Sequence, residues 1–186
     1  YDLNTYYQNY EALSKDKSSP LWNRALMSTY EPGSTMKPAI AAAGLEEGVI
    51  TETSKFYCSH IYRQFTDTTF KCLGSHGWID VKNALNQSCN IYFYETGRLL
   101  GINRMNDYCT RFGLGQKTGV EINESSGVLA GIAYREAHGG TWYPGDTVQA
   151  AIGQSDNLFT PIQLCSYVST IANGGTRYRA HFVKSV

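Results

Sequence analysis

Two short serine motifs carry the residues best suited to chemistry in this chain. Ser34 is followed three residues later by Lys37, a spacing that puts both side chains on one helix face, one turn apart. A serine hydroxyl becomes a good nucleophile when a nearby base takes its proton, and a lysine with a lowered pKa can be that base. Ser88 and Asn90 form a second motif, again at the expected start of a helix. Each motif alone is also typical of a capped helix, so neither settles a function.

Three cysteines and a histidine form a second candidate cluster. Cys58, Cys72, His76 and Cys89 are separated by 13, 3 and 12 residues, and Cys89 lies inside the second serine motif. Three thiolates and one imidazole are a common tetrahedral set for structural zinc. A Cys58–Cys72 disulfide and free buried thiols remain as alternatives. The odd total of five cysteines leaves at least one thiol outside any disulfide within the chain.

The elements that must position these residues are mostly helices. The patterns predict helices over 36–45, 80–87, 91–100, 105–112, 147–152 and 161–172, a hairpin over 56–73 and a strand over 176–183. The hairpin would bring Cys58 and Cys72 together. Residues 1–33 and 116–145 are expected to be irregular, because proline, glycine and serine interrupt them. Cys109 and Cys165 fall on apolar helix faces, where we expect core residues.

The totals describe an ordinary globular chain with no nucleic-acid signature. Among 186 residues, 42% are apolar and 17% are charged, which is typical of one folded domain. Lys plus Arg and Asp plus Glu balance at 16 each, so nothing indicates binding to nucleic acid or to an acidic membrane surface. No apolar run approaches the roughly 18–20 residues that a membrane span needs.

Taken together and in order, the motifs resemble those of the penicillin-binding transpeptidases. Tyr30–Pro38 resembles the nucleophile segment of that family, and Leu21–Ala25 ahead of it also fits. Ser88–Tyr94 is similar to the second S-x-N motif, and Ile152–Gln154 with Thr160–Gln163 is similar to the glycine-glutamine segment that follows. The similarity covers nearly the whole chain, which we identify as a member of the class B, elongation-type penicillin-binding proteins.

The resemblance implies a peptidoglycan D,D-transpeptidase that needs no cofactor for catalysis. Ser34 would attack the penultimate D-alanine of a stem peptide ending in D-Ala-D-Ala, and the acyl-enzyme would pass to an amine on a neighbouring stem. β-Lactams would acylate the same serine. Lys37 is the implied base, Ser88 the implied proton relay, and Asn90 would hold Lys37 and the substrate amide. The backbone N–H of Ser34 would supply half of the oxyanion hole.

The resemblance extends to binding residues, metal and location. It implies that Gly153 and Gln154 bind substrate. The chain resembles some elongation-type members that have a zinc site. Their zinc ligands lie in the corresponding hairpin, at the His-Gly that follows it and inside S-x-N, so the resemblance favours zinc at Cys58, Cys72, His76 and Cys89. The domain is expected on the extracytoplasmic face of the bacterial cell membrane, beside cell-wall elongation or division proteins.

The implied fold is α+β, with a five-stranded antiparallel sheet, flanking helices and a large helical lobe. We expect residues 1–186 to form a single partial transpeptidase domain, a truncated fold with the helical lobe, the hairpin and remnants of the sheet. The family's third motif, K-[ST]-G, is not at Lys117-Thr118-Gly119, which precedes the glycine-glutamine segment and is followed by Val120 instead of Thr or Ser.

The true third motif should follow the 176–183 strand and lie beyond the chain. Losing one oxyanion donor typically lowers a rate by about 10²–10³, so we expect little or no turnover from this chain alone. An exposed sheet edge would favour a dimer or a strand swap.

Two alternative functions remain. A class A β-lactamase needs a glutamate in a Glu-x-x-Leu-Asn context, which 121–125 does not match, and class D enzymes and β-lactam sensors usually carry S-x-V where this chain has Ser88-Cys89-Asn90. A non-catalytic module that binds the cell-wall machinery is the other alternative.

Overall fold

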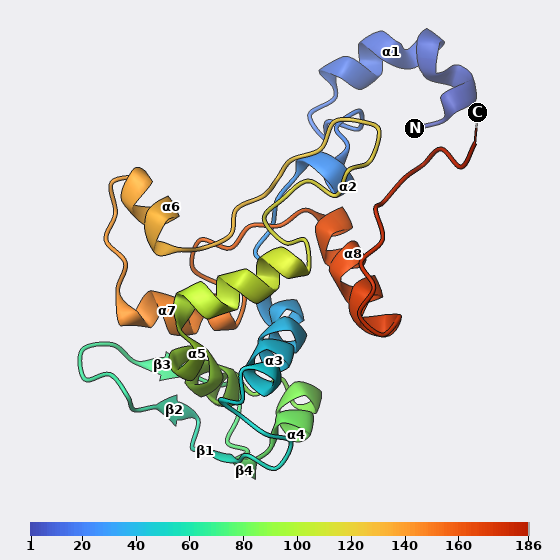
Figure 1. Cartoon of the computed structure of the whole chain (residues 1–186). Helices are drawn as coiled ribbons and strands as arrows, with labels where there is room; N and C mark the ends of the chain where they lie inside the picture. The colour runs from blue at the N-terminus through green and yellow to red at the C-terminus, as the bar shows by residue number, and fades with distance from the viewer. Residues whose placement is uncertain (186) are drawn as a thin grey trace.

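The computed structural model describes residues 1–185, which fold mainly into helices with a small antiparallel ribbon at one end (Figure 1). The helices are α1 (Tyr6–Lys15), α2 (Arg24–Met27), α3 (Lys37–Glu46), α4 (Val81–Asn86), α5 (Asn90–Arg111), α6 (Ile132–Ala137), α7 (Pro144–Ala151) and α8 (Pro161–Ala172), with 3-10 turns at Leu3–Thr5 and Gly33–Met36. The strands are β1 (Phe56–Cys58), β2 (Ile61–Tyr62), β3 (Phe70–Lys71) and β4 (Gly77–Ile79). None of the helices in this part of the chain is long and apolar enough to cross a membrane.

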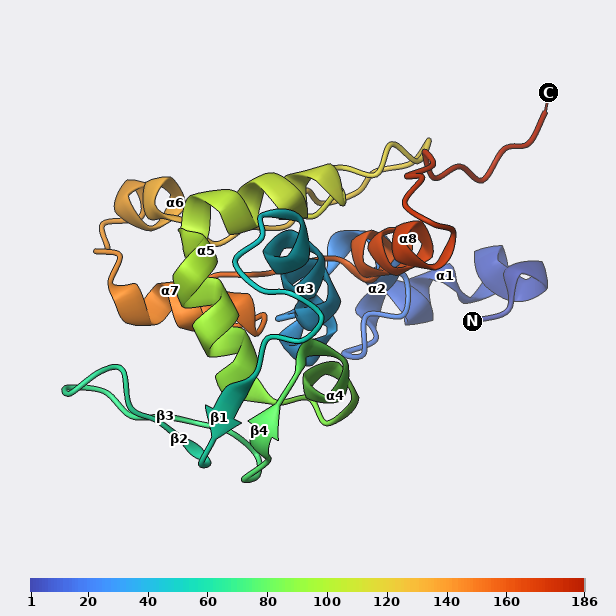
Figure 2. The ribbon, with the colours of Figure 1, turned by 60° about the horizontal axis from the view of Figure 1, so that its bottom comes forward.

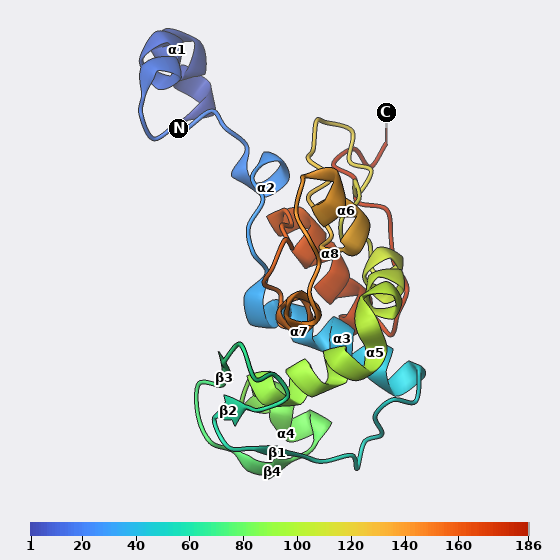
Figure 3. The ribbon, with the colours of Figure 1, turned by 90° about the vertical axis from the view of Figure 1, so that its left-hand side faces the viewer.

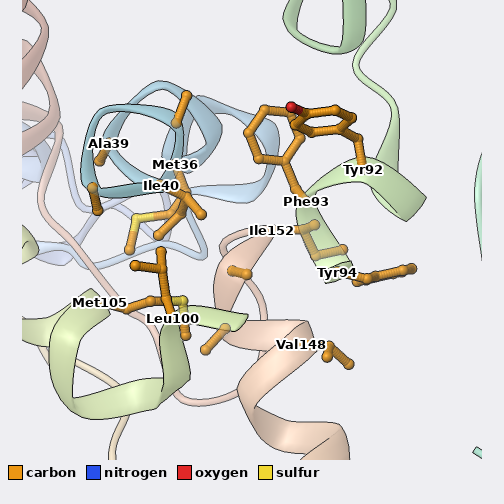
Figure 4. Packing of buried hydrophobic residues seen from close by; sticks show 14 of the residues in the cluster. Met36, Ala39, Ile40, Tyr92, Phe93, Tyr94, Leu100, Met105, Val148 and Ile152 are labelled. Atoms are coloured by element: carbon orange, nitrogen blue, oxygen red, sulfur yellow. The ribbon is translucent and has the colours of Figure 1, made fainter. Parts of the chain in front are cut away.

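The centre of the molecule is α5, which packs against both α3 and α7 (Figures 2 and 3). Small residues allow the helices to approach closely. A Cβ added at Gly97 of α5 would lie 2.4 Å from Ala151 Cβ, and one added at Gly44 of α3 would lie 2.8 Å from Thr96 Cγ2. Apolar side chains from all three helices meet in one buried cluster (Figure 4). This core fixes the start of α3 relative to the start of α5, where the two serine motifs lie.

The long helix α5 joins two helices that the sequence predicts separately. The predicted segments 91–100 and 105–112 both lie in α5, which is kinked at Gly101. Gly101 has φ 73° and ψ 160°, a conformation in the left-handed half of φ that glycine adopts without steric cost. The kink turns the second half of the helix across α3, as Figure 2 shows.

The ribbon is longer than the predicted hairpin over 56–73. The β2 strand pairs with β3, with Ile61 opposite Lys71, but β1 pairs with β4, with Cys58 opposite Gly77. Two residues, 59 and 60, separate β1 from β2, whereas five residues, 72–76, separate β3 from β4, so the segment 72–76 bulges. Its ends are held by hydrogen bonds from Cys72 N to His60 O at 2.8 Å and from His76 N to Cys58 O at 3.1 Å. The bulge brings Cys72 and His76 beside Cys58.

Three further predictions about elements and one about the burial of a cysteine are wrong. The segment 176–183 is irregular, because a strand needs a hydrogen-bonded neighbour and no strand of residues 1–185 lies beside it. The dimer expected through a sheet edge stays a prediction. Helices α1 and α6 lie in segments predicted to be irregular. Cys165 is exposed on α8, whereas Cys109 is buried as predicted.

Candidate active site

Ser34 and Lys37 lie where the 3-10 turn Gly33–Met36 runs into α3. Gly33 has φ 54°, which bends the chain immediately before Ser34. Ser34 is exposed, while Lys37, the first residue of α3, is buried with 1% of its surface exposed. Tyr167 of α8 holds the turn in place. Its hydroxyl donates to Thr35 O at 2.9 Å and accepts from Ala39 N at 3.1 Å. Sequence reasoning missed Tyr167, which has no motif to distinguish it from a core aromatic residue.

Side chains of the two serine motifs form one connected cluster, named here the nucleophile cluster: Ser34, Lys37, Ser88 and Asn90. Ser88 Oγ lies 2.8 Å from Ser34 Oγ and 3.0 Å from Lys37 Nζ, so it stands between the two. Lys37 Nζ also donates to Ser88 O at 2.8 Å and to Asn90 Oδ1 at 2.7 Å. Asn90 Nδ2 in turn donates to Lys71 O at 3.2 Å. The four predicted residues therefore meet, and the hydroxyl of Ser88 links the serine to the amine.

The environment of Lys37 makes its neutral form more accessible than in an exposed lysine. Burial lowers the pKa of Lys37 to about 8, and the thiols of Cys72 and Cys89 oppose this by raising the pKa. No carboxylate is among the hydrogen-bond partners of the nucleophile cluster in residues 1–185. A lysine of this kind can accept a proton near neutral pH.

Ser88 has a backbone conformation that is uncommon for a residue with a side chain. Its φ is 51°, in the left-handed region, which usually costs about 1–2 kcal/mol for a residue other than glycine. Lys37 holds both the carbonyl and the hydroxyl of Ser88. Surrounding contacts of this kind can maintain a strained residue at a functional position.

Gly153 and Gln154 lie behind the nucleophile turn. Gly33 N donates to Gly153 O at 3.0 Å, and a Cβ added at Gly153 would lie 2.2 Å from Gly33 O. Gly153 also has φ 74°, so both its conformation and its surroundings require glycine. The half-buried side chain of Gln154 donates to Gly153 O at 3.3 Å. Gly153 therefore contacts the backbone just before Ser34, and Gln154 contacts Gly153.

The second cluster, named here the Cys/His cluster, consists of Cys58, Cys72, His76 and Cys89. Their ligand atoms all lie within 4.8 Å of one another. His76 Nδ1 is 3.4 Å from Cys58 Sγ and 3.7 Å from Cys72 Sγ, and Cys72 Sγ is 4.0 Å from Cys89 Sγ. Tetrahedral zinc with Zn–S near 2.3 Å puts two sulfurs about 3.8 Å apart, so the observed spacing suits that ion.

The surroundings of the Cys/His cluster also suit a cation. The three cysteines are buried and unpaired in this structure. Burial raises the pKa of the Cys89 thiol to about 12, so a positive ion is needed to hold it as a thiolate. Asn90 N donates to Cys72 Sγ at 3.2 Å, a contact typical of the surroundings of metal-bound sulfur. The donor set therefore fits zinc.

The segment Lys117-Thr118-Gly119 is part of an irregular loop closed around Glu124. The Glu124 carboxylate accepts from Thr118 N, Thr118 Oγ1 and Gly119 N at 2.7–3.0 Å. These residues therefore do not form a strand, which the family's third motif requires.

Comparison with known proteins places the chain in a family. The family model described as the penicillin binding protein transpeptidase domain matches residues 1–186. The chain belongs to this family, and the predicted fold class is confirmed. It is 34% identical over 185 residues to the peptidoglycan D,D-transpeptidase MrdA of Salmonella typhimurium, a match that covers 95% of this chain and 29% of that protein. The chain thus spans less than a third of the length of this relative.

Solved structures give the same answer for the fold. Pseudomonas aeruginosa PBP2 in complex with WCK 5153 superposes with a TM-score of 0.92 at 35% identity, covering 100% of this chain and 44% of that one. Helicobacter pylori PBP2 in its complex with MreC has a TM-score of 0.88 at 29% identity, covering 95% of this chain and 34% of that one.

Proposed function

We propose that this chain carries the nucleophile of a peptidoglycan D,D-transpeptidase, with Ser34 forming the acyl-enzyme. The observation that carries the proposal is the position of Ser88 Oγ between Ser34 Oγ and the buried amine of Lys37. This arrangement gives the serine proton a short path to a base whose pKa is lowered to about 8. Family membership supports the same reaction.

In the proposed acylation, the proton of Ser34 passes to Ser88 Oγ while the proton of Ser88 passes to neutral Lys37. Ser34 Oγ bonds to the carbonyl carbon of the penultimate D-alanine. Ser88 then gives its proton to the nitrogen of the terminal D-alanine as the C–N bond breaks, and protonated Lys37 returns a proton to Ser88. An amine of a second stem peptide attacks the resulting ester and forms the crosslink; its proton passes to Lys37, and Lys37 returns a proton through Ser88 to Ser34 Oγ as the ester C–O bond breaks.

Asn90 and the turn before Ser34 set the geometry of this reaction. The Asn90 carbonyl oxygen holds Lys37, and its amide group donates to Lys71 O, leaving a second amide N–H suited to the substrate backbone. The N–H of Ser34 would stabilise the oxyanion. Gly153 would act on substrate through the backbone next to Ser34, and Gln154, which donates to Gly153 O, is proposed to bind substrate beside it.

A long-lived acyl-enzyme fits this site better than β-lactamase activity. Hydrolysis of the ester needs a base to activate water, and the nucleophile cluster has no carboxylate among its hydrogen-bond partners in the described residues. The chain would therefore be a target of β-lactams that traps them, rather than an enzyme that destroys them.

The Cys/His cluster is proposed to hold one structural zinc ion. Cys58, Cys72, His76 and Cys89 supply four ligands, which closes a tetrahedral site without an open position. The ion would supply rigidity rather than reactivity. Cys89 is its ligand from the second motif, so the ion would hold the ribbon against the turn that presents Ser88 and Asn90.

The wider setting is proposed from the family. Residues 1–186 would be part of an elongation-type transpeptidase domain on the extracytoplasmic face of the bacterial membrane, acting on stem peptides that end in D-Ala-D-Ala. The H. pylori relative is described in a complex with MreC, and a comparable cell-wall partner is proposed here.

The proposed function is tested by labelling with a fluorescent penicillin, followed by mass spectrometry of the labelled peptide. We expect label on Ser34 in the full-length protein, and no label on the Ser34→Ala variant. Ser14→Ala, which changes an exposed serine on α1, is the matched control and should label normally. Absence of labelling in the folded full-length protein, or label on another residue, would reject the proposal.

A further inference from the structure

The helix α6 lies at the edge of the molecule and is attached to it in an unusual way (Figure 1). It has six residues and none of them is buried. So short a helix is unstable alone in water and needs tertiary contacts. One is the hydrogen bond from Asn106 Nδ2 to Ala130 O at 2.9 Å, just before the helix. Several others come from the side chain of Arg135.

Arg135 binds several groups with one guanidinium. Its Nε donates to Asp156 Oδ2 at 2.6 Å, and its Nη2 donates to Asp146 Oδ1 and to Ser155 Oγ, both at 3.2 Å. The guanidinium carbon lies 5.6 Å from the centre of the Trp142 ring. A planar fork of this kind can hold two carboxylates and a hydroxyl at once, which the single ammonium of a lysine cannot reproduce.

Two of these partners belong to the segment 153–156 behind the nucleophile turn. Ser155 has φ 64°, a left-handed conformation that costs about 1–2 kcal/mol for serine. Its hydroxyl is held by Arg135. At the other end of the segment, Gly153 O accepts from Gly33 N at 3.0 Å. Gly33 precedes Ser34, so this segment joins Arg135 to the nucleophile turn through a short run of backbone.

We propose that Arg135 is a positioning residue for Ser34, acting through the segment 153–156. It does not contact the nucleophile cluster. By holding Ser155 in its strained conformation and fixing the Asp156 carboxylate, it keeps Gly153 against Gly33 and so sets the direction of the turn that carries Ser34. The inference rests on the proposed function of Ser34 and adds a residue from outside the family motifs.

The first test compares Arg135→Lys with wild type in the full-length protein. Because a misplacement of about 1 Å can cost about 10²-fold in rate, we expect the maximal acylation rate by fluorescent penicillin to fall roughly 10- to 10²-fold. The penicillin concentration at half-maximal rate should change little. Arg98→Lys is the matched control, because Arg98 forms an ion pair with Glu95 on α5, and it should keep the wild-type rate.

A second variant separates positioning from stability. Ser155→Gly removes the hydroxyl that Arg135 holds and also removes the steric cost of the left-handed φ, so its melting temperature should stay level or rise. The maximal acylation rate should nevertheless fall, because a glycine at this position can also adopt other φ values once Arg135 no longer holds a hydroxyl there. A merely structural role for the contact predicts that rate and stability change together, so a stable variant with the wild-type rate would overturn the proposal.

Hydrogen exchange gives a readout that does not depend on acylation. In both variants the Gly33 amide, which donates to Gly153 O, should exchange faster, while the Ile50 amide, which donates to Gly44 O, should be unchanged. Unchanged exchange at Gly33 would overturn the proposal. If wild-type protein is not acylated at all, the proposed function of Ser34 fails, and exchange at Gly33 still decides whether Arg135 orders the turn.

Discussion

Ser88 and Asn90 turn their side chains toward Lys37, whereas Cys89 between them turns toward Cys72, so one turn serves two clusters. The nucleophile cluster is held by helices: α3 and α5 pack closely, and every link in the cluster is a direct hydrogen bond. The Cys/His cluster is held by strands of two and three residues, which have little stability of their own.

This difference shows how the two clusters depend on their surroundings. The helical core can position Ser34 and Lys37 without an ion, because buried apolar contacts fix both helix starts. The Cys/His cluster brings three buried sulfurs and an imidazole together, which a cation would stabilise. The hydrogen bond from Asn90 N to Cys72 Sγ links the clusters, so a change in the ribbon should reach the second motif.

The largest expected effect is the loss of metal. Cys72→Ser should lower the zinc content from about one ion per chain to near zero. Structural zinc can contribute on the order of 10 kcal/mol, so the melting temperature should fall by more than about 10 °C. Mass spectrometry of the metal and a thermal melt measure both. Cys165→Ser, which changes an exposed cysteine, is the control. If the wild-type protein contains no zinc and a strong chelator does not change its melting temperature, the cluster holds free thiols or a disulfide instead.

Removing the base should come next in size. Lys37→Met keeps a long side chain in the buried site but removes the amine, and acylation by penicillin should fall by about 10²–10⁴-fold. Zinc content should be unchanged if the two clusters are held independently. Lys17→Met alters an exposed lysine and serves as the control. Retention of more than a tenth of the wild-type rate would show that another group takes the serine proton.

The close contact behind Ser34 gives a smaller effect, measured as the free energy of unfolding in urea. Gly153→Ala should cost about 2–5 kcal/mol, because the left-handed φ is joined by a backbone clash with Gly33. Gly48→Ala is matched in φ, at 66°, but no atom lies within 4 Å of the added Cβ, so it should cost only about 1–2 kcal/mol. Equal losses of stability in the two variants would mean that the close contact between Gly153 and Gly33 does not limit the side chain at position 153.

The smallest effect is a pH dependence that belongs to the nucleophile cluster. With the pKa of Lys37 lowered by burial to about 8, the acylation rate should rise about ninefold between pH 6 and 7 and level off above about pH 9. The free energy of unfolding should also depend on Lys37. Between pH 8 and 10.5 the lysine binds more protons in the unfolded chain than in the folded one, so its contribution to stability increases with pH. A rate that is flat from pH 6 to 9 would contradict a lysine base.

Local signals in the sequence predicted several elements correctly. Helix α8 spans the predicted 161–172, because Thr160 caps it and Pro161 occupies its first turn. Asp80 caps α4 as predicted, by accepting from Asn83 N. Each signal acts over three or four residues, which a sequence shows directly.

Features that depend on distant segments were not predictable in the same way. The pairing of β1 with β4 and the bulge over 72–76 depend on which segments meet, so the predicted hairpin ended too early. The 176–183 segment has a strand-like composition, but composition cannot supply a hydrogen-bonded neighbour. Helix α6 buries no residue, and its Arg135 binds Asp156 and Asp146, which lie 21 and 11 residues away in the sequence.

The sequence by itself determined the residue types and the order of the motifs, and with them the family, because Ser-x-x-Lys, Ser-x-Asn and the glycine-glutamine segment are short and contiguous. Only the tertiary structure decided that Ser88 stands between Ser34 and Lys37, that Lys37 is buried and so has a lowered pKa, and that Arg135 reaches the segment behind the nucleophile. Distances and burial between segments 20–100 residues apart arise from packing of the helical core, and no local pattern encodes them.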